Sequence, residues 1–222
     1  MSKALIGVYG ASGYGREVQP LVREVLALLP NDSKLVFIDD NAELTEMNSY
    51  PVVNYELFLA DPASEKAVAV AIANSQVRES IFGKLAEDGI GTLNVKAPNV
   101  IIMDEVNLGH GSILSPFVTL TSNICIGVGF HANIYSYVGH DCVIGDFVTF
   151  APSVKCNGNI EIGDHAYIGT GAIIKQGRPG KPLKIGAGAV VGMGAVVAKN
   201  VPAGETVIGN PARPLSRSAL RG

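Results

Sequence analysis

The amino-acid sequence predicts two domains of different classes, a small α/β domain with a parallel sheet and, after it, a parallel β-helix. Three observations carry this prediction. Apolar strands alternate with helical patterns in the first half of the chain, a six-residue apolar repeat fills most of the second half, and a short segment at residues 96–99 joins the two. We therefore expect the α/β domain over residues 1–95, the β-helix over 96–211 and a C-terminal tail over 212–222.

The six-residue repeat begins at Ile102 and ends at Ile174. A period of six is typical of a parallel β-helix, in which three short strands make one triangular coil of eighteen residues. We expect each repeat residue, and the residue four places after it, to point into the prism. The residues between them turn the corners, which we expect glycine at the first corner position to ease. The repeat residues are Ile102, Leu108, Leu114, Leu120, Ile126, Ala132, Val138, Ile144, Phe150, Cys156, Ile162, Ile168 and Ile174.

The repeat breaks once, after Ile174. Residues 175–184 add five residues before the period resumes at Ile185, Val191 and Val197. An insertion in a repeat of this kind predicts a projecting loop.

Basic side chains gather in the same part of the chain. Eight of the 17 Lys and Arg residues follow residue 174, against one of the 20 Asp and Glu residues. This asymmetry indicates either an anionic ligand near the C-terminus or a solvated charged tail. The eight are Lys175, Arg178, Lys181, Lys184, Lys199, Arg213, Arg217 and Arg221.

The chain shows no targeting signal and no apolar stretch near the roughly 18 residues of a membrane span. Its three cysteines have no metal-site spacing, and Cys142 and Cys156 fall on inward positions of the repeat, as small core residues do. We expect a reduced cytoplasmic enzyme with neither a nucleic-acid nor a membrane partner.

In the first half, three apolar segments at residues 4–9, 35–38 and 67–73 are predicted strands with helices between them. Parallel sheets of this kind bind ligands at the carboxyl ends of their strands. Three sets of residues fall there, and each is a candidate for binding a mononucleotide or nucleotide sugar. They are the glycine loop Gly10, Ser12, Gly13, Tyr14 and Gly15, the pair Asp39 and Asp40, and the pair Asn74 and Ser75.

The glycine loop precedes a helix, where backbone N–H groups and the helix N-terminus can meet a phosphate. Its spacing, G-x-x-G-x-G, differs from the dinucleotide fingerprint, and the domain is about half as long as a full dinucleotide fold. Asp39 and Asp40 can accept hydrogen bonds from a base or a ribose. The alternative for the loop is a tight turn without a ligand.

His140 is the candidate catalytic residue of the repeat. Residues eighteen apart stack about 4.8 Å from one another, so Ser122 and Gly158 are its neighbours on adjacent coils. The missing side chain at Gly158 predicts a slot for a ligand beside the imidazole. Asp141, next in sequence, is placed to orient the ring.

The same positions argue against two other chemistries. Cys142 points inward where His140 points outward, which disfavours a Cys–His nucleophilic pair. The four histidines occupy four different positions in the coil, so no two stack in one column. A zinc site would need ligands from two subunits to converge, and we expect no metal. The histidines are His110, His131, His140 and His165.

Nearly the whole chain resembles the hexapeptide-repeat family of sialic acid O-acetyltransferases and nucleotide-amino-sugar N-acetyltransferases. Its relatives acetylate UDP-4-amino sugars, GDP-perosamine and dTDP-4-amino-4,6-dideoxyglucose. The resemblance rests on residues 133–145 around His140, on the ending VVGMGAVVAKNVPAGETVIGNPAR, and on GASGYG, FIDDN and AIANSQVR in the first half. It implies a left-handed β-helix, a homotrimer with active sites between subunits, and acetyl-CoA as co-substrate in the groove between β-helices.

The resemblance also implies roles for residues. His140 is the general base and Asp141 supports it, while the first domain holds the nucleotide. Asn133 is expected to contact the substrate. The residues expected to bind the coenzyme are Gly158, Thr170, Met193, Gly194, Lys199 and Arg213. Two positions depart from the family pattern, since Tyr14 and Thr149 stand where relatives often have histidine.

The implied reaction is direct attack of a 4-amino group of a nucleotide-linked 4-amino-4,6-dideoxy sugar on acetyl-CoA, in the assembly of O-antigen and lipopolysaccharide. Two alternatives stay open. One is O-acetylation of sialic acid, which needs no nucleotide pocket. The other is a non-catalytic trimeric scaffold that binds nucleotide sugars.

Overall fold

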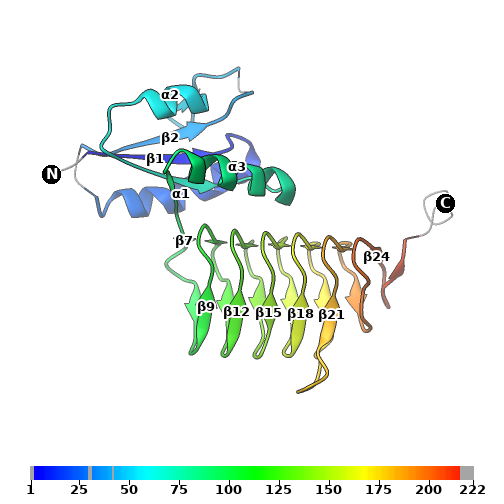
Figure 1. The fold of residues 1–222 in the computed structure, drawn as a ribbon. Helices are drawn as coiled ribbons and strands as arrows, with labels where there is room; N and C mark the ends of the chain where they lie inside the picture. The colour runs from blue at the N-terminus through cyan, green and yellow to red at the C-terminus, as the bar shows by residue number, and fades with distance from the viewer. Residues whose placement is uncertain (1–2, 30–31, 42, 216–222) are drawn as a thin grey trace. The chain divides into compact units, whose positions relative to one another are not determined.

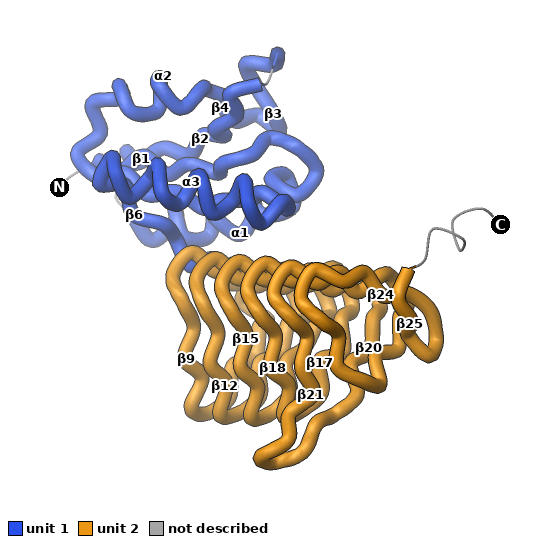
Figure 2. The backbone as a smooth tube through the Cα atoms, turned by 45° about the vertical axis from the view of Figure 1, so that its right-hand side comes forward, with its two compact units in different colours: residues 1–95 blue, residues 96–222 orange. Residues whose placement is uncertain are grey.

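The computed structural model describes residues 3–29, 32–41 and 43–215, and the chain divides into two compact units, residues 1–95 and 96–222 (Figure 1, Figure 2). Among the described residues, none of the helices combines the length and the apolar character that crossing a bilayer requires. Each unit has its own layout.

In the described part of residues 1–95, six strands form one sheet in the order β3-β4-β2-β1-β5-β6. The central strands β2, β1 and β5 pair in parallel, as predicted, and every residue of β1 is buried. The short elements β3, β4, β6 and α2 were not predicted. The strands are β1 (Ala4–Tyr9), β2 (Lys34–Ile38), β3 (Glu46–Met47), β4 (Tyr50–Val53), β5 (Glu65–Val70) and β6 (Gly91–Thr92), and the helices are α1 (Gly13–Leu26), α2 (Tyr55–Ala60) and α3 (Ser75–Glu87).

Local chemistry explains where α3 begins and ends. The Asn74 side chain accepts hydrogen bonds from the backbone N–H groups of Gln76 and Val77, which caps the first turn. Gly89 lies just beyond the last turn with φ +69°, a left-handed conformation that suits glycine, and it ends the helix.

Residues 96–215 form the predicted left-handed β-helix, in which three parallel sheets enclose a triangular core (Figure 1). Strands pair with those one coil away, so Tyr137 pairs with Lys155, eighteen residues on. The inserted residues lengthen one step, and Ile162 pairs with Ile185. The first sheet contains β7 (Val95–Lys96), β10 (Ile113–Leu114), β13 (His131–Ala132), β16 (Thr149–Phe150), β19 (Tyr167–Ile168), β22 (Val190–Val191), β24 (Thr206–Ile208) and β25 (Arg213–Pro214).

The other two sheets complete the prism. The second contains β8 (Ile101–Ile102), β11 (Thr119–Leu120), β14 (Tyr137–Val138), β17 (Lys155–Cys156), β20 (Ile173–Ile174) and β23 (Val196–Val197). The third contains β9 (Val106–Leu108), β12 (Ile124–Ile126), β15 (Val143–Ile144), β18 (Ile160–Ile162) and β21 (Leu183–Ile185).

The inward positions of the repeat form the core, as predicted. From Leu114 to Ile174 every sixth residue is buried, and only the first coil leaves Ile102 and Leu108 partly exposed. Apolar side chains stacked at each coil therefore supply the hydrophobic stabilisation of this unit.

The residues between the inward positions turn the corners, as predicted. The third residue after each repeat position from Ile102 to Ile168, such as Asn123, Asp141 or Asn159, has φ between +55° and +69°. The glycines at the first corner position have no such φ. They are needed because the next coil approaches closely, and a Cβ at Gly139 would lie 2.7 Å from the backbone of Asn157 and Gly158.

The predicted tail does not begin at residue 212. Ala212 packs against the core, and β25 pairs antiparallel with β24, closing the last coil. Arg217 and Arg221, counted among the basic residues of the tail, lie outside the described residues.

Candidate active site

His140 and Asp141 lie on the prism edge that joins the second sheet to the third, between β14 and β15. Backbone hydrogen bonds to both neighbouring coils hold this corner. The Asp141 N–H donates to the Ser122 carbonyl at 3.2 Å, and the Asn159 N–H donates to the His140 carbonyl at 2.8 Å. The stack of coils therefore fixes the backbone from which the two side chains project.

The imidazole and the carboxylate are in contact. His140 Nδ1 lies 2.7 Å from Asp141 Oδ2, and both side chains are about half exposed, at 51% and 49%. An ionised carboxylate can only accept a hydrogen bond, so Nδ1 carries the hydrogen and donates it, and Nε2 presents its lone pair. Asp141 thus selects the tautomer in which Nε2 can act as a base.

Gly158 lies directly against the face of that imidazole. A Cβ at Gly158 would lie 2.5 Å from His140 Nε2 and 2.6 Å from Cε1. The predicted empty slot beside the ring is therefore wrong, because the ring itself occupies the space over the glycine. Any side chain at residue 158 would displace the imidazole.

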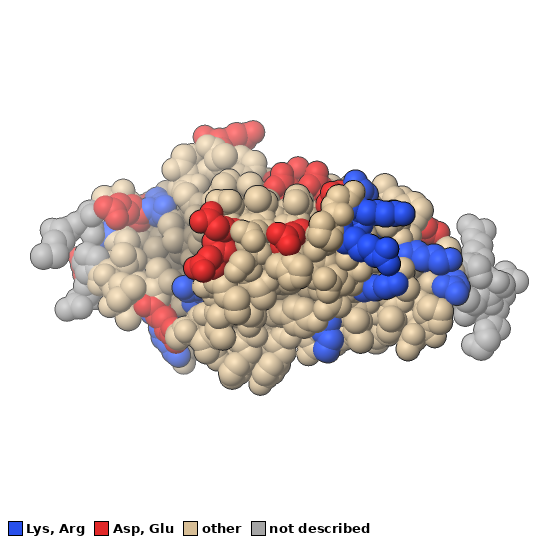
Figure 3. Space-filling view, turned by 90° about the horizontal axis from the view of Figure 1, so that it is seen from below, with Lys and Arg blue, Asp and Glu red and all other residues tan. Residues whose placement is uncertain are grey.

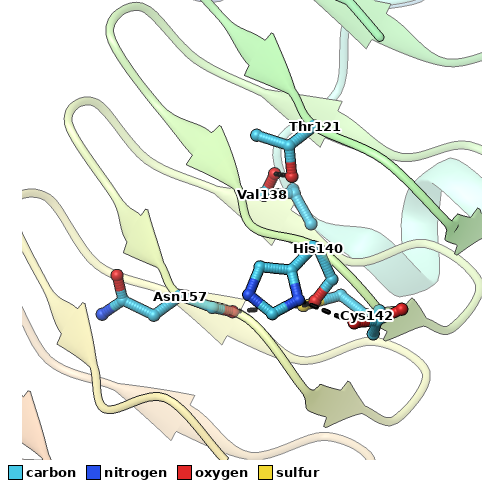
Figure 4. Close-up of polar contacts among 6 residues, drawn as sticks. Thr121, Val138, His140, Cys142 and Asn157 are labelled. Carbon is cyan, nitrogen blue, oxygen red and sulfur yellow. Dashed lines mark hydrogen bonds and ion pairs between the residues drawn. The ribbon is translucent and has the colours of Figure 1, made fainter. Parts of the chain in front are cut away.

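Asn157, which precedes Gly158, has hydrogen-bond partners that the sequence did not predict. Asn157 accepts from the Tyr137 hydroxyl at 2.8 Å and donates from Nδ2 to the Ile174 carbonyl at 2.7 Å. Cys142 Sγ contacts the Asn157 carbonyl at 3.2 Å, and Figure 4 shows Asn157 and Cys142 on either side of the ring. In the sequence, the only feature that points to Asn157 is its position one residue before Gly158.

Tyr137 lies on β14, and its hydroxyl donates a hydrogen bond to Asn157. Burial raises the pKa of Tyr137, so the hydroxyl keeps its proton and acts as a donor.

The two inward cysteines behave as core residues. Cys142 and Cys156 are buried within the prism, and the hydrogen bond that the Cys156 thiol donates to Cys142, together with burial, raises the pKa of Cys156 well above its usual value. Neither sulfur shares the outward face of His140. Among the described residues, no group of three or more His, Cys, Asp and Glu side chains is placed to hold a metal ion.

The inserted residues project from the same edge as His140, two coils further along. The Gly177 N–H donates to the Gly158 carbonyl at 3.0 Å, and the Leu183 N–H donates to the Asn159 carbonyl at 3.2 Å. A cavity of about 540 Å³ lies between this loop and the corner of Asp141. Its lining includes Asp141, Asn159, Glu161, Arg178, Lys181 and Lys184.

The coenzyme-binding residues expected from the resemblance fall in three places. Gly158 and Lys199 lie on the edge of His140, and Lys199 shares a cavity of about 310 Å³ with Arg213 near the last coil. The third group lies on a different edge, between the first and second sheets. It consists of Thr170, Met193 and Gly194, together with the expected substrate residue Asn133, so one subunit does not bring these side chains to His140.

In the first unit, the glycine loop connects β1 to α1. Gly10 has φ +107°, and a Cβ at Gly15 would overlap the Gly10 carbonyl, so both positions need glycine for the fold. Gly13 differs, since a Cβ there would meet only the end of Arg16 at 4.0 Å. Ser12 precedes the helix without a side-chain capping bond, which leaves the helix N-terminus suited to an anion.

Asp39 and Asp40 have partners within the unit. Asp39 accepts from the Ala11 N–H at 3.0 Å and ties the glycine loop to the end of β2. Asp40 accepts from the Tyr9 hydroxyl at 2.7 Å and the Tyr55 N–H at 2.8 Å. Burial opposes ionisation of Asp40, but these hydrogen bonds lower its pKa, so it stays charged.

These contacts change how the predicted substrate residues are interpreted. Asp40 and Asn74 each use their carboxyl or amide oxygens to hold the loops, and Asn74 caps α3. Ser75 is the first residue of that helix. The side chains of Asp40 and Asn74 therefore position the loops at the carboxyl edge of the sheet.

Arg78 was not predicted. It is fully buried in the first turns of α3, and Nη1 donates to the Ile72 carbonyl at 2.7 Å. Burial lowers the pKa of its guanidinium to about 10, and the nearby Tyr14 opposes this shift. Tyr14, which departs from the family pattern, therefore lies close to a buried cation.

Comparison with known proteins decides the family. The first unit matches the PglD N-terminal domain over residues 5–85. The chain is 50% identical to GDP-perosamine N-acetyltransferase from Escherichia coli O157:H7 over 215 residues, which are 96% of this chain and 97% of the relative. This protein belongs to the nucleotide-amino-sugar N-acetyltransferase family.

Solved structures of family members have the same fold. WeeI from Acinetobacter baumannii AYE is 62% identical, with a TM-score of 0.93 over 96% of this chain and all of that one. The acetyltransferase domain of PglB from Neisseria gonorrhoeae FA1090, solved with acetyl coenzyme A, is 29% identical. Its TM-score is 0.85 over 96% of this chain and all of that domain.

Proposed function

We propose that this N-acetyltransferase moves the acetyl group of acetyl-CoA onto the 4-amino group of a nucleotide-linked 4-amino-4,6-dideoxy sugar. The observation that carries the proposal is the His140 site, in which Asp141 holds Nδ1 and leaves Nε2 as the acceptor. The name of the 50% identical relative makes GDP-perosamine the first candidate substrate.

The proposed chemistry needs one base and no covalent enzyme intermediate. The amine nitrogen attacks the thioester carbonyl carbon while Nε2 of His140 takes the proton that the nitrogen loses. A backbone N–H stabilises the oxyanion. When the C–S bond breaks, the coenzyme leaves as a thiolate, and the imidazolium returns the proton to it.

Asp141 and Gly158 serve the base in different ways. The Asp141 carboxylate holds the ring and stabilises the imidazolium that forms, while Gly158 makes room for the ring. Cys142 is not a nucleophile, since its sulfur faces the interior. These contacts support direct attack rather than a thioester on the protein.

The two ligands are assigned to different parts of the chain. The nucleotide phosphates meet the glycine loop and the N-terminus of α1 around Gly13. The coenzyme phosphates meet the basic loop and Lys199, and the cavity beside Asp141 receives the arm that carries the thioester.

The test is a panel of nucleotide 4-amino sugars carrying GDP, dTDP or UDP, each mixed with acetyl-CoA and assayed for thiol release. We expect GDP-perosamine to release thiol and gain one acetyl group on nitrogen, as measured by mass spectrometry. Free sialic acid is the comparison acceptor. Thiol release with sialic acid alone would favour O-acetylation, and the absence of thiol release with every acceptor would favour the scaffold.

A further inference from the structure

The inserted loop ends in a tight hairpin whose two flanking residues are both cations. Arg178 and Lys181 exchange backbone hydrogen bonds at 3.1 and 2.9 Å across Pro179 and Gly180. Gly180 has φ +70°, and a proline followed by a left-handed glycine forms a type II turn. The turn is rigid, because proline restricts the first central residue.

The hairpin places two positive side chains next to each other. Residues that exchange both backbone hydrogen bonds lie directly opposite each other, with side chains on one face. Like charges at such a pair are destabilising. Among the described residues neither cation forms an ion pair, whereas the neighbouring Lys184 Nζ contacts Glu161 Oε2 at 2.6 Å.

The base of the hairpin is fixed to the catalytic edge. A Cβ at Gly177 would overlap the Asn159 carbonyl, and the hydrogen bonds to Gly158 and Asn159 attach the loop to the coil beneath His140. Arg178 and Lys181 line both the 540 Å³ cavity beside Asp141 and a second cavity of about 370 Å³ on the far side. Figure 3 shows the Lys and Arg side chains gathered on this face.

We propose that Arg178 and Lys181 form a clamp for the 3′-phosphate of the acetyl donor. This inference rests on the proposed function, which assigns the coenzyme to this edge. A phosphomonoester carries close to two negative charges and three acceptor oxygens, so it cancels the repulsion between the two cations. An arginine fork binds such a group with two parallel hydrogen bonds, and the lysine adds a point charge.

The clamp makes the hairpin a specificity determinant for the donor. Acetyl-CoA carries the 3′-phosphate, whereas acetyl-dephospho-CoA keeps the same pantetheine and pyrophosphate without it. Binding of CoA and dephospho-CoA is therefore measured by calorimetry without any sugar, followed by KM and kcat for both acetyl donors. We expect the wild-type protein to bind CoA roughly tenfold or more tightly than dephospho-CoA.

Two variants change the charge of the hairpin and are expected to leave its fold intact. Lys181→Glu places a carboxylate opposite Arg178, so the hairpin gains an ion pair and the melting temperature does not fall. Its affinity for CoA is expected to drop to that for dephospho-CoA, with kcat unchanged. The double variant Arg178→Gln/Lys181→Gln removes both charges and is expected to behave in the same way. Lys155→Gln, an exposed lysine on β17, is the matched control.

The outcomes are distinct. The clamp is supported if Lys181→Glu loses affinity for CoA while its affinity for dephospho-CoA stays unchanged. Equal binding of the two coenzymes by the wild-type protein overturns it, and so does an equal loss of both in Lys181→Glu, which would place the contact on the pyrophosphate. Neither of the results that would overturn the clamp contradicts the proposed function. The proposed function fails only if the protein does not transfer acetyl groups to nucleotide amino sugars.

Discussion

At the scale of single residues, the catalysis that we propose depends on three neighbouring residues, each with its own role. His140 supplies Nε2, Asp141 holds Nδ1 at 2.7 Å, and Gly158 leaves the space that the ring occupies. The contact between Gly158 and the ring tolerates the least change, since a Cβ cannot lie 2.5 Å from a ring nitrogen.

Gly158→Ala is therefore expected to push the imidazole away from the acceptor amine. We expect kcat to fall by about 10²-fold, since a displacement of about 1 Å has that cost in catalysis. Acetyl-CoA affinity and the melting temperature change little, because the ring is half exposed and can swing into solvent. Gly188→Asn is the control, since Gly188 is a left-handed corner glycine with open space around it, where asparagine is tolerated. If Gly158→Ala kept wild-type kcat, the ring would not need its observed position.

At the scale of elements, the loop between β1 and α1 contains glycines that are present for different physical reasons. Gly10 and Gly15 are needed by the fold, through a positive φ and a close approach. Gly13 has room for a side chain, so the fold does not require glycine there, and we propose that a ligand approaches the backbone at this position.

Gly13→Val is expected to raise the KM for the nucleotide sugar roughly tenfold or more, with the KM for acetyl-CoA and the melting temperature near wild type. Gly15→Ala is expected instead to lower the melting temperature, because the methyl group overlaps the Gly10 carbonyl. Steady-state kinetics and thermal melts separate the two. A parallel rise in both KM values for a folded Gly13→Val protein would contradict the assignment of the nucleotide to this loop.

The sequence predicted some of these elements well and others poorly, for physical reasons. The period of six located the inward residues and the projecting loop because burial acts on every coil alike. The left-handed corner residues escaped notice because Tyr135, Phe147 and Asp141 carry no common side-chain signal there. The structural partners of Asp40 and Asn74 could not be predicted, since a sequence shows a polar side chain without showing what it contacts.

At the scale of the whole molecule, the edge between the first and second sheets exposes aromatic side chains of the kind that interfaces between subunits cover. The rings of Phe117 and Tyr135 stack with centroids 4.8 Å apart, yet they are 51% and 58% exposed. Both residues have φ near +60°, which is unfavourable for bulky side chains. The coenzyme residues expected from the resemblance, Thr170 and Met193, share this edge.

We propose a homotrimer in which this edge of one subunit meets the His140 edge of the next. Sedimentation at micromolar protein is expected to give three times the chain mass of 23.1 kDa. Tyr135→Glu places a charge at the contact and is expected to dissociate the trimer and abolish activity together. A monomeric wild-type protein that is fully active would contradict this proposal.

The measurement that tests the central claim most directly is the steady-state rate of two variants at the base. His140→Ala removes the proton acceptor but leaves Gly158 and the basic hairpin in place, so we expect kcat to fall by about 10²–10⁴-fold with CoA affinity near wild type. Asp141→Asn is expected to cost less, since it keeps the ring but loses the carboxylate. With folding confirmed by circular dichroism, a His140→Ala protein within about threefold of wild-type kcat, well below the range for general bases, would contradict the account.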